Sequence, residues 1–89
     1  MRSSSTLIMP KVFEIEGFRG FFFSNEGSPS EPIHIHIKKG DGEAKFWVMP
    51  IISLAESRKM KVSELARAQE IVTERRQEIL DSWASYFKL

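Results

Sequence analysis

The fold is decided by the stretch from Ile33 to Val48, which reads IHIHIKKGDGEAKFWV. In its first half isoleucine alternates with histidine and lysine, the period-2 pattern of a strand that is buried on one face. The segment 39–42 then predicts a tight turn, because Asp-Gly favours the backbone angles of a short hairpin connection. Over 43–48 every second residue is again apolar. The stretch therefore predicts a β-hairpin with one buried face.

The same alternation fixes the opposite face of the hairpin. A one-residue slip in register would bury charged groups. The sequence therefore predicts which side chains share a face of the hairpin, although it does not predict which residues pair across the two strands. The polar hairpin face, as we call it, collects His34, His36, Lys38, Glu43, Lys45 and Trp47. It combines imidazoles that titrate near neutral pH, permanent cations and a large ring beside a single carboxylate.

The segments before the hairpin predict further antiparallel strands. Residues 12–16 and 18–23 are rich in apolar and aromatic side chains and are separated by Gly17. The segment 24–32 contains Asn, Gly, Ser and Pro, which predicts a loop. Arg19 either extends the basic surface or pairs with an acidic residue of the preceding strand, Glu14 or Glu16, and pairing is the preferred interpretation.

The segments after the hairpin predict a short extended piece at 51–54, a basic connector or helical turn at 55–61, and one long amphipathic helix with Ser63 as N-cap. Arg75 and Arg76 interrupt its apolar stripe, so either their stems cover the edge of the core or the helix bends there. The fold class is α+β: an antiparallel sheet of about four strands, with a long C-terminal helix packed on one face. The predicted core consists of Phe13, Ile15, Ile33, Ile35, Ile37, Phe46 and Val48 against Leu65, Val72, Ile79 and Trp83.

Composition limits the class of protein. The 89 residues suffice for one domain, which we place at 9–89 after a flexible tail at 1–8, with Met9 as an alternative start. The absence of cysteine excludes disulfides and thiolate sites and fits a cytoplasmic protein. No apolar run approaches the roughly 20 residues of a membrane span. Residues 38–61 carry six basic and three acidic groups, whereas the net charge of the whole chain is +1, so the middle can contact an anionic partner.

Motifs spread over nearly the whole chain carry a family resemblance: Met9-Pro10, Gly17-Phe18-Arg19, 21–26, 34–36, 40–47, Leu54-Ala55 and 83–87. In these the chain resembles a bacterial family known as domain of unknown function 4160. It departs from the family pattern at Gly20, where an aromatic residue is usual, and at Glu31-Pro32, where a Pro-Pro pair is usual. The resemblance implies a small bacterial protein that is often encoded beside another small protein, in an arrangement like a toxin–antitoxin pair. It implies no established reaction.

His34 and His36 are the first candidate site, because alternate residues of a strand project from one face about 6.5–7 Å apart. As general acid and base they would cleave RNA without a metal, with Lys45 stabilising the charged phosphorane. As metal ligands they would need a further ligand, for which Glu43 is in reach. As solvated residues of an open sheet face they would have no chemical role. Trp47 either stacks on a ligand or is covered by the C-terminal helix.

The preferred function is that of a toxin–antitoxin-type protein that binds RNA through the polar hairpin face. If it is an enzyme, we expect a metal-independent endoribonuclease that uses His34, His36 and Lys45. Arg19, Lys38, Glu43 and Trp47 would then contact the nucleic acid or the partner. The alternative is a non-catalytic interaction module that binds or neutralises a protein encoded beside it, through a sheet edge or an apolar strip of the C-terminal helix. We expect no metal, no cofactor and no membrane contact, and the oligomeric state is left open.

Overall fold

The computed structural model describes residues 11–23 and 32–87. The predicted tail at 1–8 and nearly all of the predicted loop at 24–32 lie outside the described residues. The elements are β1 (Lys11–Ile15), β2 (Phe18–Phe21), β3 (His34–Lys39), β4 (Gly42–Trp47), β5 (Ser53–Arg58), α1 (Val62–Glu74) and α2 (Arg76–Phe87). The protein is therefore an α+β domain, with a strand-rich first part and helices at the C-terminal end.

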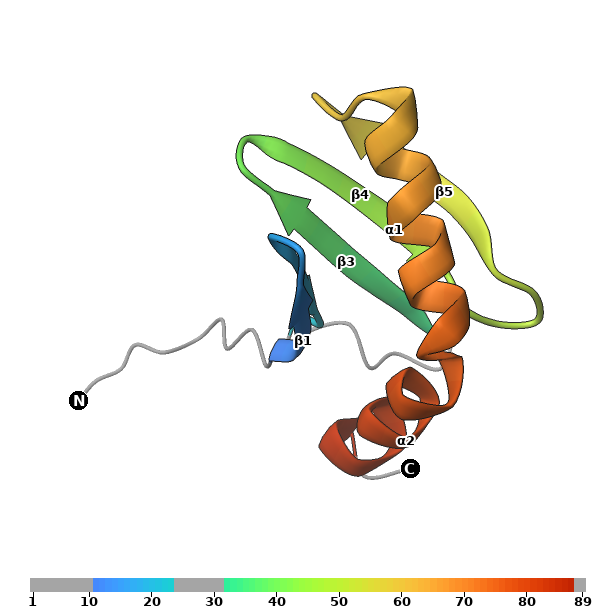
Figure 1. Ribbon diagram of the computed structural model, residues 1–89. Coiled ribbons are helices and arrows are strands. Elements are labelled where there is room, and N and C mark those ends of the chain that lie inside the picture. Colours follow the sequence, from blue (N-terminus) through green and yellow to red (C-terminus); the bar gives the residue numbers. More distant parts are fainter. Residues whose placement is uncertain (1–10, 24–31, 88–89) are drawn as a thin grey trace.

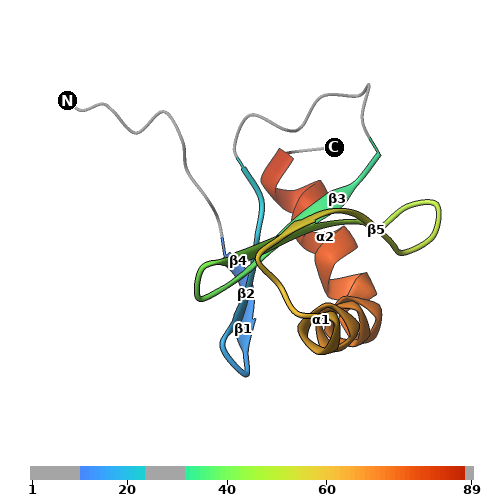
Figure 2. The ribbon, with the colours of Figure 1, turned by 90° about the horizontal axis from the view of Figure 1, so that it is seen from above.

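The strands form one antiparallel sheet in the order β1-β2-β3-β4-β5, so each strand pairs with its neighbours in the sequence. α1 lies on one side of this twisted sheet, where it crosses over β4 and β5 (Figure 1), and α2 continues from it past the end of the sheet at which β3 begins (Figures 1 and 2). The side of the sheet opposite α1 is called the outer face below. The candidate site lies on this outer face.

The core lies between the sheet and the helices, as the alternation predicted. In the β3–β4 hairpin Ile35 is opposite Phe46 and Ile37 is opposite Ala44, and all of these side chains are buried. Every predicted core residue is buried or packs against the buried cluster. Phe18, Phe22 and Ile71 are also buried there, although the prediction did not include them. The predicted facing of the hairpin is confirmed.

The sheet has one strand more than expected. The segment predicted as an extended piece followed by a connector forms β5, which pairs with β4 from Ser53 to Arg58. The register shifts between Lys45 and Phe46 of β4, and this shift leaves Ala55 as an extra residue in β5. Its sequence, SLAESR, has low strand propensity and no clean alternation. Pairing with the backbone of β4, rather than local preference, makes this segment a strand.

The expected single helix is two helices that meet at Arg75. That residue leaves the helical region (φ −107°, ψ 20°), while its N–H still donates to the carbonyl of Ile71 at 3.0 Å. The predicted bend at the arginine pair is therefore confirmed. The expected N-cap at Ser63 is wrong: α1 begins at Val62, and the carboxylate of Glu64 accepts a hydrogen bond from the N–H of Lys61 at 2.9 Å.

Gly20 fits a close contact within the first hairpin. It is opposite Phe13 of β1, and a Cβ at position 20 would lie only 2.5 Å from the ring of Phe13. The phenylalanine ring therefore lies across the glycine backbone and covers it from the core side. An aromatic residue at position 20, as is usual in the family pattern, would displace that ring. Glycine at this position leaves the space that the ring of Phe13 occupies.

An ion pair ties the turn between β1 and β2 to α1. Both carboxylate oxygens of Glu16 accept hydrogen bonds from Arg67, at 2.9 and 2.7 Å. The Arg67 hydrogen bond holds the pKa of Glu16 below its ordinary value. The pKa of Glu16 is thus lower in the folded than in the unfolded state, where it is about 4.3. The pair therefore stabilises the protein fully at pH values above the unfolded-state pKa. This stabilisation is lost as the pH falls through the folded-state pKa of Glu16.

Glu16→Gln is therefore expected to lower stability at pH 7 and to lose less stability than the wild type on acidification. Denaturant unfolding at a series of pH values from 7 to 2 would measure this difference. Glu78→Gln is the matched control, because Glu78 accepts a hydrogen bond from Arg75 within one helical turn and so pairs locally. Parallel pH profiles for the wild type and Glu16→Gln would contradict the role of the pair.

Candidate nucleic-acid interface

The strand register aligns the side chains of the outer face into two rows that cross the sheet. The central row, from β1 to β5, consists of Lys11, Phe21, His36, Lys45 and Glu56. The charged row beside it consists of Glu14, Arg19, Lys38, Glu43 and Arg58. The polar hairpin face is thus the middle of a wider surface, which β2 supplies with phenylalanine and β5 with a further acid and base.

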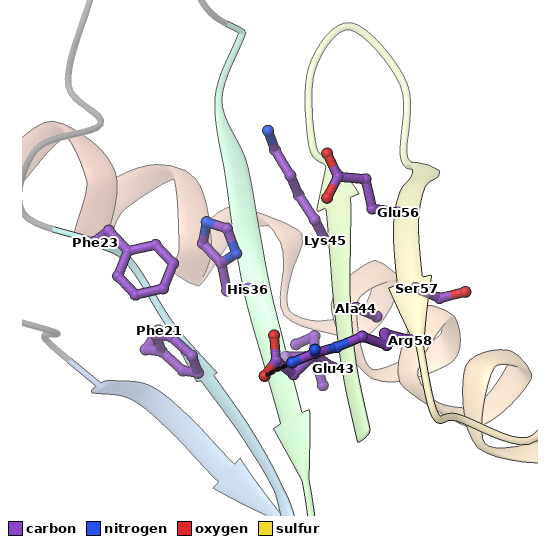
Figure 3. A pocket seen from close by; sticks show the side chains of 10 residues that line it. Phe21, Phe23, His36, Glu43, Ala44, Lys45, Glu56, Ser57 and Arg58 are labelled. Atoms are coloured by element: carbon purple, nitrogen blue, oxygen red, sulfur yellow. Dashed lines mark hydrogen bonds and ion pairs between the residues drawn. The ribbon is translucent and has the colours of Figure 1, made fainter. Parts of the chain in front are cut away.

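Aromatic rings gather where β2 meets β3. The ring centroid of His36 lies 4.4 Å from that of Phe23 and 5.9 Å from that of Phe21, and the latter pair is stacked at 22°. Phe21 and Phe23 meet edge to face at 5.5 Å. All three side chains are half-buried, and in Figure 3 both phenylalanine rings lie on the same side of His36. We call these residues the aromatic cluster.

Two neighbouring pockets flank the aromatic cluster, and both are lined by Phe21, Phe23 and Glu43. The aromatic pocket, about 280 Å³, is also lined by His36 and Lys45 and by the β5 side chains Glu56 and Arg58 (Figure 3). The cationic pocket, about 230 Å³, is completed by Lys11, Arg19 and Lys38. Each is smaller than the 300–1,000 Å³ or so of sites for drug-sized ligands, so each suits a group no larger than a nucleobase or a phosphate.

His34 is not on the surface, contrary to the expectation of two exposed imidazoles. Its side chain has an exposed fraction of 0%. The ring lies edge-on to Trp47 of β4 and Trp83 of α2, at 5.6 and 5.3 Å, and Nδ1 donates to the carbonyl of Pro32 at 2.9 Å. Alternation does place position 34 on the outer side, but Trp83 contacts the ring near the start of β3 and encloses it. His36 lines the aromatic pocket, whereas His34 lines neither of the two pockets described above.

The other predicted site residues lie on the outer face. Nζ of Lys45 is 4.6 Å from the ring centre of the half-buried Trp47, a cation–π contact. Glu43 accepts a hydrogen bond from Arg58 at 2.9 Å and lies 3.7 Å from Nζ of Lys38. The Arg58 hydrogen bond, above all, holds the pKa of Glu43 below its ordinary value.

Arg19 is opposite Glu14 on one side and Lys38 on the other. Its charge contributes to the lowered pKa of Glu14, although the hydrogen bond from Lys11 at 2.8 Å is the larger cause. Glu16, the other predicted partner of Arg19, is bound to Arg67 instead. Arg19 therefore belongs to the basic surface and faces one carboxylate that another cation already contacts.

The sequence-based prediction missed part of this surface. Phe21 and Phe23 were assigned to one face with Arg19, but only the pairing of β2 with β3 shows that this face adjoins His36. Glu56 was missed, and Arg58 was assigned to a basic connector, because β5 was not recognised as a strand. Among the described residues no three side chains of His, Cys, Asp or Glu form a group that could hold a metal ion. Likewise, none of the helices in 62–87 is long and apolar enough to cross a membrane.

Comparisons with known proteins gave one match. A family model described as a domain of unknown function (DUF4160) matches residues 17–84. This range contains the strands from β2 to β5, all of α1 and most of α2. No curated protein and no solved structure matches the chain.

Proposed function

The chain belongs to the family described as domain of unknown function (DUF4160), and we propose that it binds single-stranded RNA on the outer face of its sheet. The observation that carries this proposal is the aromatic cluster, half-buried in the middle of the face and bordered by cationic side chains. Proteins bind single-stranded RNA by stacking unpaired bases on aromatic rings and by contacting phosphates with lysine and arginine. Both kinds of group occur here side by side.

The charge of the face favours an anionic ligand. The two cross-strand rows hold five lysine and arginine side chains and three glutamates, in addition to His36. The helix-covered face of the sheet is occupied by the apolar core. Binding through such a surface would weaken as salt concentration rises, because phosphate contacts release counterions.

The proposal is one of binding and not of cleavage by paired histidines. General acid–base catalysis requires both groups within hydrogen-bond reach of the substrate. His34 is enclosed by tryptophan rings, so it cannot contact a ligand on the outer face without a rearrangement of the core. His36 contributes its ring to the aromatic cluster, where stacking is its proposed role.

The double variant Phe21→Leu/Phe23→Leu is expected to weaken RNA binding while the fold is kept. Leucine preserves apolar contact but removes the flat ring face, and stacking contributes about 1–3 kcal/mol per base. The dissociation constant for a labelled oligouridylate, measured by fluorescence anisotropy, should therefore rise roughly tenfold or more.

Ile51→Ala is the control, because Ile51 is an apolar side chain that is 70% exposed and lies outside both pockets. It should leave the affinity for RNA unchanged. A wild-type protein that binds no RNA, or a double variant with wild-type affinity, would refute the proposal.

A protein partner at β5 is the second candidate, because exposed apolar side chains gather at this edge of the sheet. Among the described strands β5 pairs only with β4, and Met49, Ile51 and Leu54 are all exposed in or just before it. An extended segment of another chain can pair with such an edge. We propose that this partner would be the small protein encoded beside this chain, as in a toxin–antitoxin pair. Expression in bacteria alone and together with the neighbouring gene would test this, since growth arrest would indicate a toxin and rescue an antitoxin.

A further inference from the structure

The cationic pocket contains an unfavourable pairing within the sheet. Arg19 of β2 and Lys38 of β3 are directly opposite each other. Like charges at directly opposed positions of an antiparallel pair are destabilising. Lys11 of β1 lines the same pocket and adds a third cation. A bound anion would offset this repulsion.

The carboxylates near the pocket do not balance these cations. Glu14 is bound to Lys11 at 2.8 Å and is also opposite Arg19. Glu43 is bound to Arg58 at 2.9 Å and lies 3.7 Å from Lys38. Two glutamates are thus shared among four cations, and this leaves a local positive excess on the outer face.

The position of the pocket indicates what kind of anion would bind. Phe21 and Phe23 line both the cationic and the aromatic pocket, so a ligand in one pocket touches the rings that border the other. A free metabolite acid would use only the cations. A nucleotide would use both, with its base against the rings and its phosphate among the cations.

We infer that the cationic pocket is a phosphate subsite, which holds the phosphate of a nucleotide whose base stacks on the aromatic cluster. This inference rests on the proposed binding of RNA. Arg19 would donate from its planar guanidinium to two phosphate oxygens, and Lys38 and Lys11 would act as point charges. Phosphate contacts in the subsite would fix the position of the strand on the sheet, while the rings would hold the base.

Titration of the isotope-labelled full chain, followed by NMR, tests this subsite with uridine, inorganic phosphate, uridine monophosphate and oligouridylate as probes. Uridine monophosphate should bind roughly tenfold or more tightly than uridine or phosphate alone, because charge-assisted hydrogen bonds add to stacking. Arg19→Gln should reduce its affinity several-fold, toward that of uridine, and leave uridine binding unchanged. The salt dependence of oligouridylate binding should flatten by about one unit of slope.

Arg75→Gln is the matched control, because it removes the same charge from the junction of α1 and α2, outside both pockets. Lys38→Gln repeats the test from the neighbouring strand, and the melting temperature shows that each variant is folded. Suppose that oligouridylate binds and that this binding depends on the phenylalanine rings, but that Arg19→Gln lowers the affinity no more than Arg75→Gln does. The phosphate subsite is then refuted, and the proposed RNA binding stands. Inorganic phosphate that binds as tightly as uridine monophosphate would also refute the nucleotide subsite. If no probe binds, the proposed function itself fails.

Discussion

Replacing Ile35 by alanine is expected to lower the free energy of unfolding by about 2–5 kcal/mol. Ile35 is fully buried in the middle of β3, opposite Phe46, which is also fully buried. Alanine would remove apolar contacts and leave a cavity that rigid neighbouring strands cannot close. Because a domain is stable by only about 5–15 kcal/mol, this one change would unfold a measurable fraction of so small a protein.

Chemical denaturation with the fluorescence of the tryptophans as probe would measure the loss for Ile35→Ala. Ile51→Ala is the matched control, since the same side chain is removed at a position that is 70% exposed. That change should alter stability by no more than about 0.5 kcal/mol. An unchanged denaturation midpoint for Ile35→Ala would overturn the facing of the hairpin.

The second large effect is expected for His34→Ala, which should cost about 2–5 kcal/mol. The imidazole fills space between Trp47 and Trp83, and its Nδ1 donates to the carbonyl of Pro32. Alanine would leave both a cavity and a carbonyl without this donor. The sequence placed both histidines on the polar hairpin face, and the burial of His34 shows that one member of the pair is enclosed instead of exposed.

His36→Ala is the comparison that separates structure from binding. His36 is half-buried, and it contacts the phenylalanine rings of the outer face instead of the core. Its removal should change stability by less than about 1 kcal/mol and weaken RNA binding, whereas His34→Ala should mainly destabilise the fold. Equal stability of the two variants in a denaturant titration would contradict the assigned positions of the two rings.

The β3–β4 hairpin and its facing follow from the sequence alone. Apolar side chains at every second position, with polar residues between them, allow only one side of the hairpin to be buried, because the other register would desolvate lysine and glutamate. The same reasoning placed His36, Lys38, Glu43, Lys45 and Trp47 on one side. The core residues Val72, Ile79 and Trp83 likewise follow from the helical spacing of apolar residues. That spacing is a local property of the sequence and can be recognised without knowledge of the tertiary structure.

The tertiary structure decided the features that depend on neighbours far along the chain. β5 lacks a strand pattern of its own and forms on the backbone of β4. The aromatic cluster exists because β2 pairs with β3, which brings Phe21 beside His36. His34 is buried because Trp83, 49 positions later in the numbering, contacts its ring. Alternation along a strand reports only the direction in which a side chain projects, whereas enclosure and side-by-side contact depend on which distant elements pack against it.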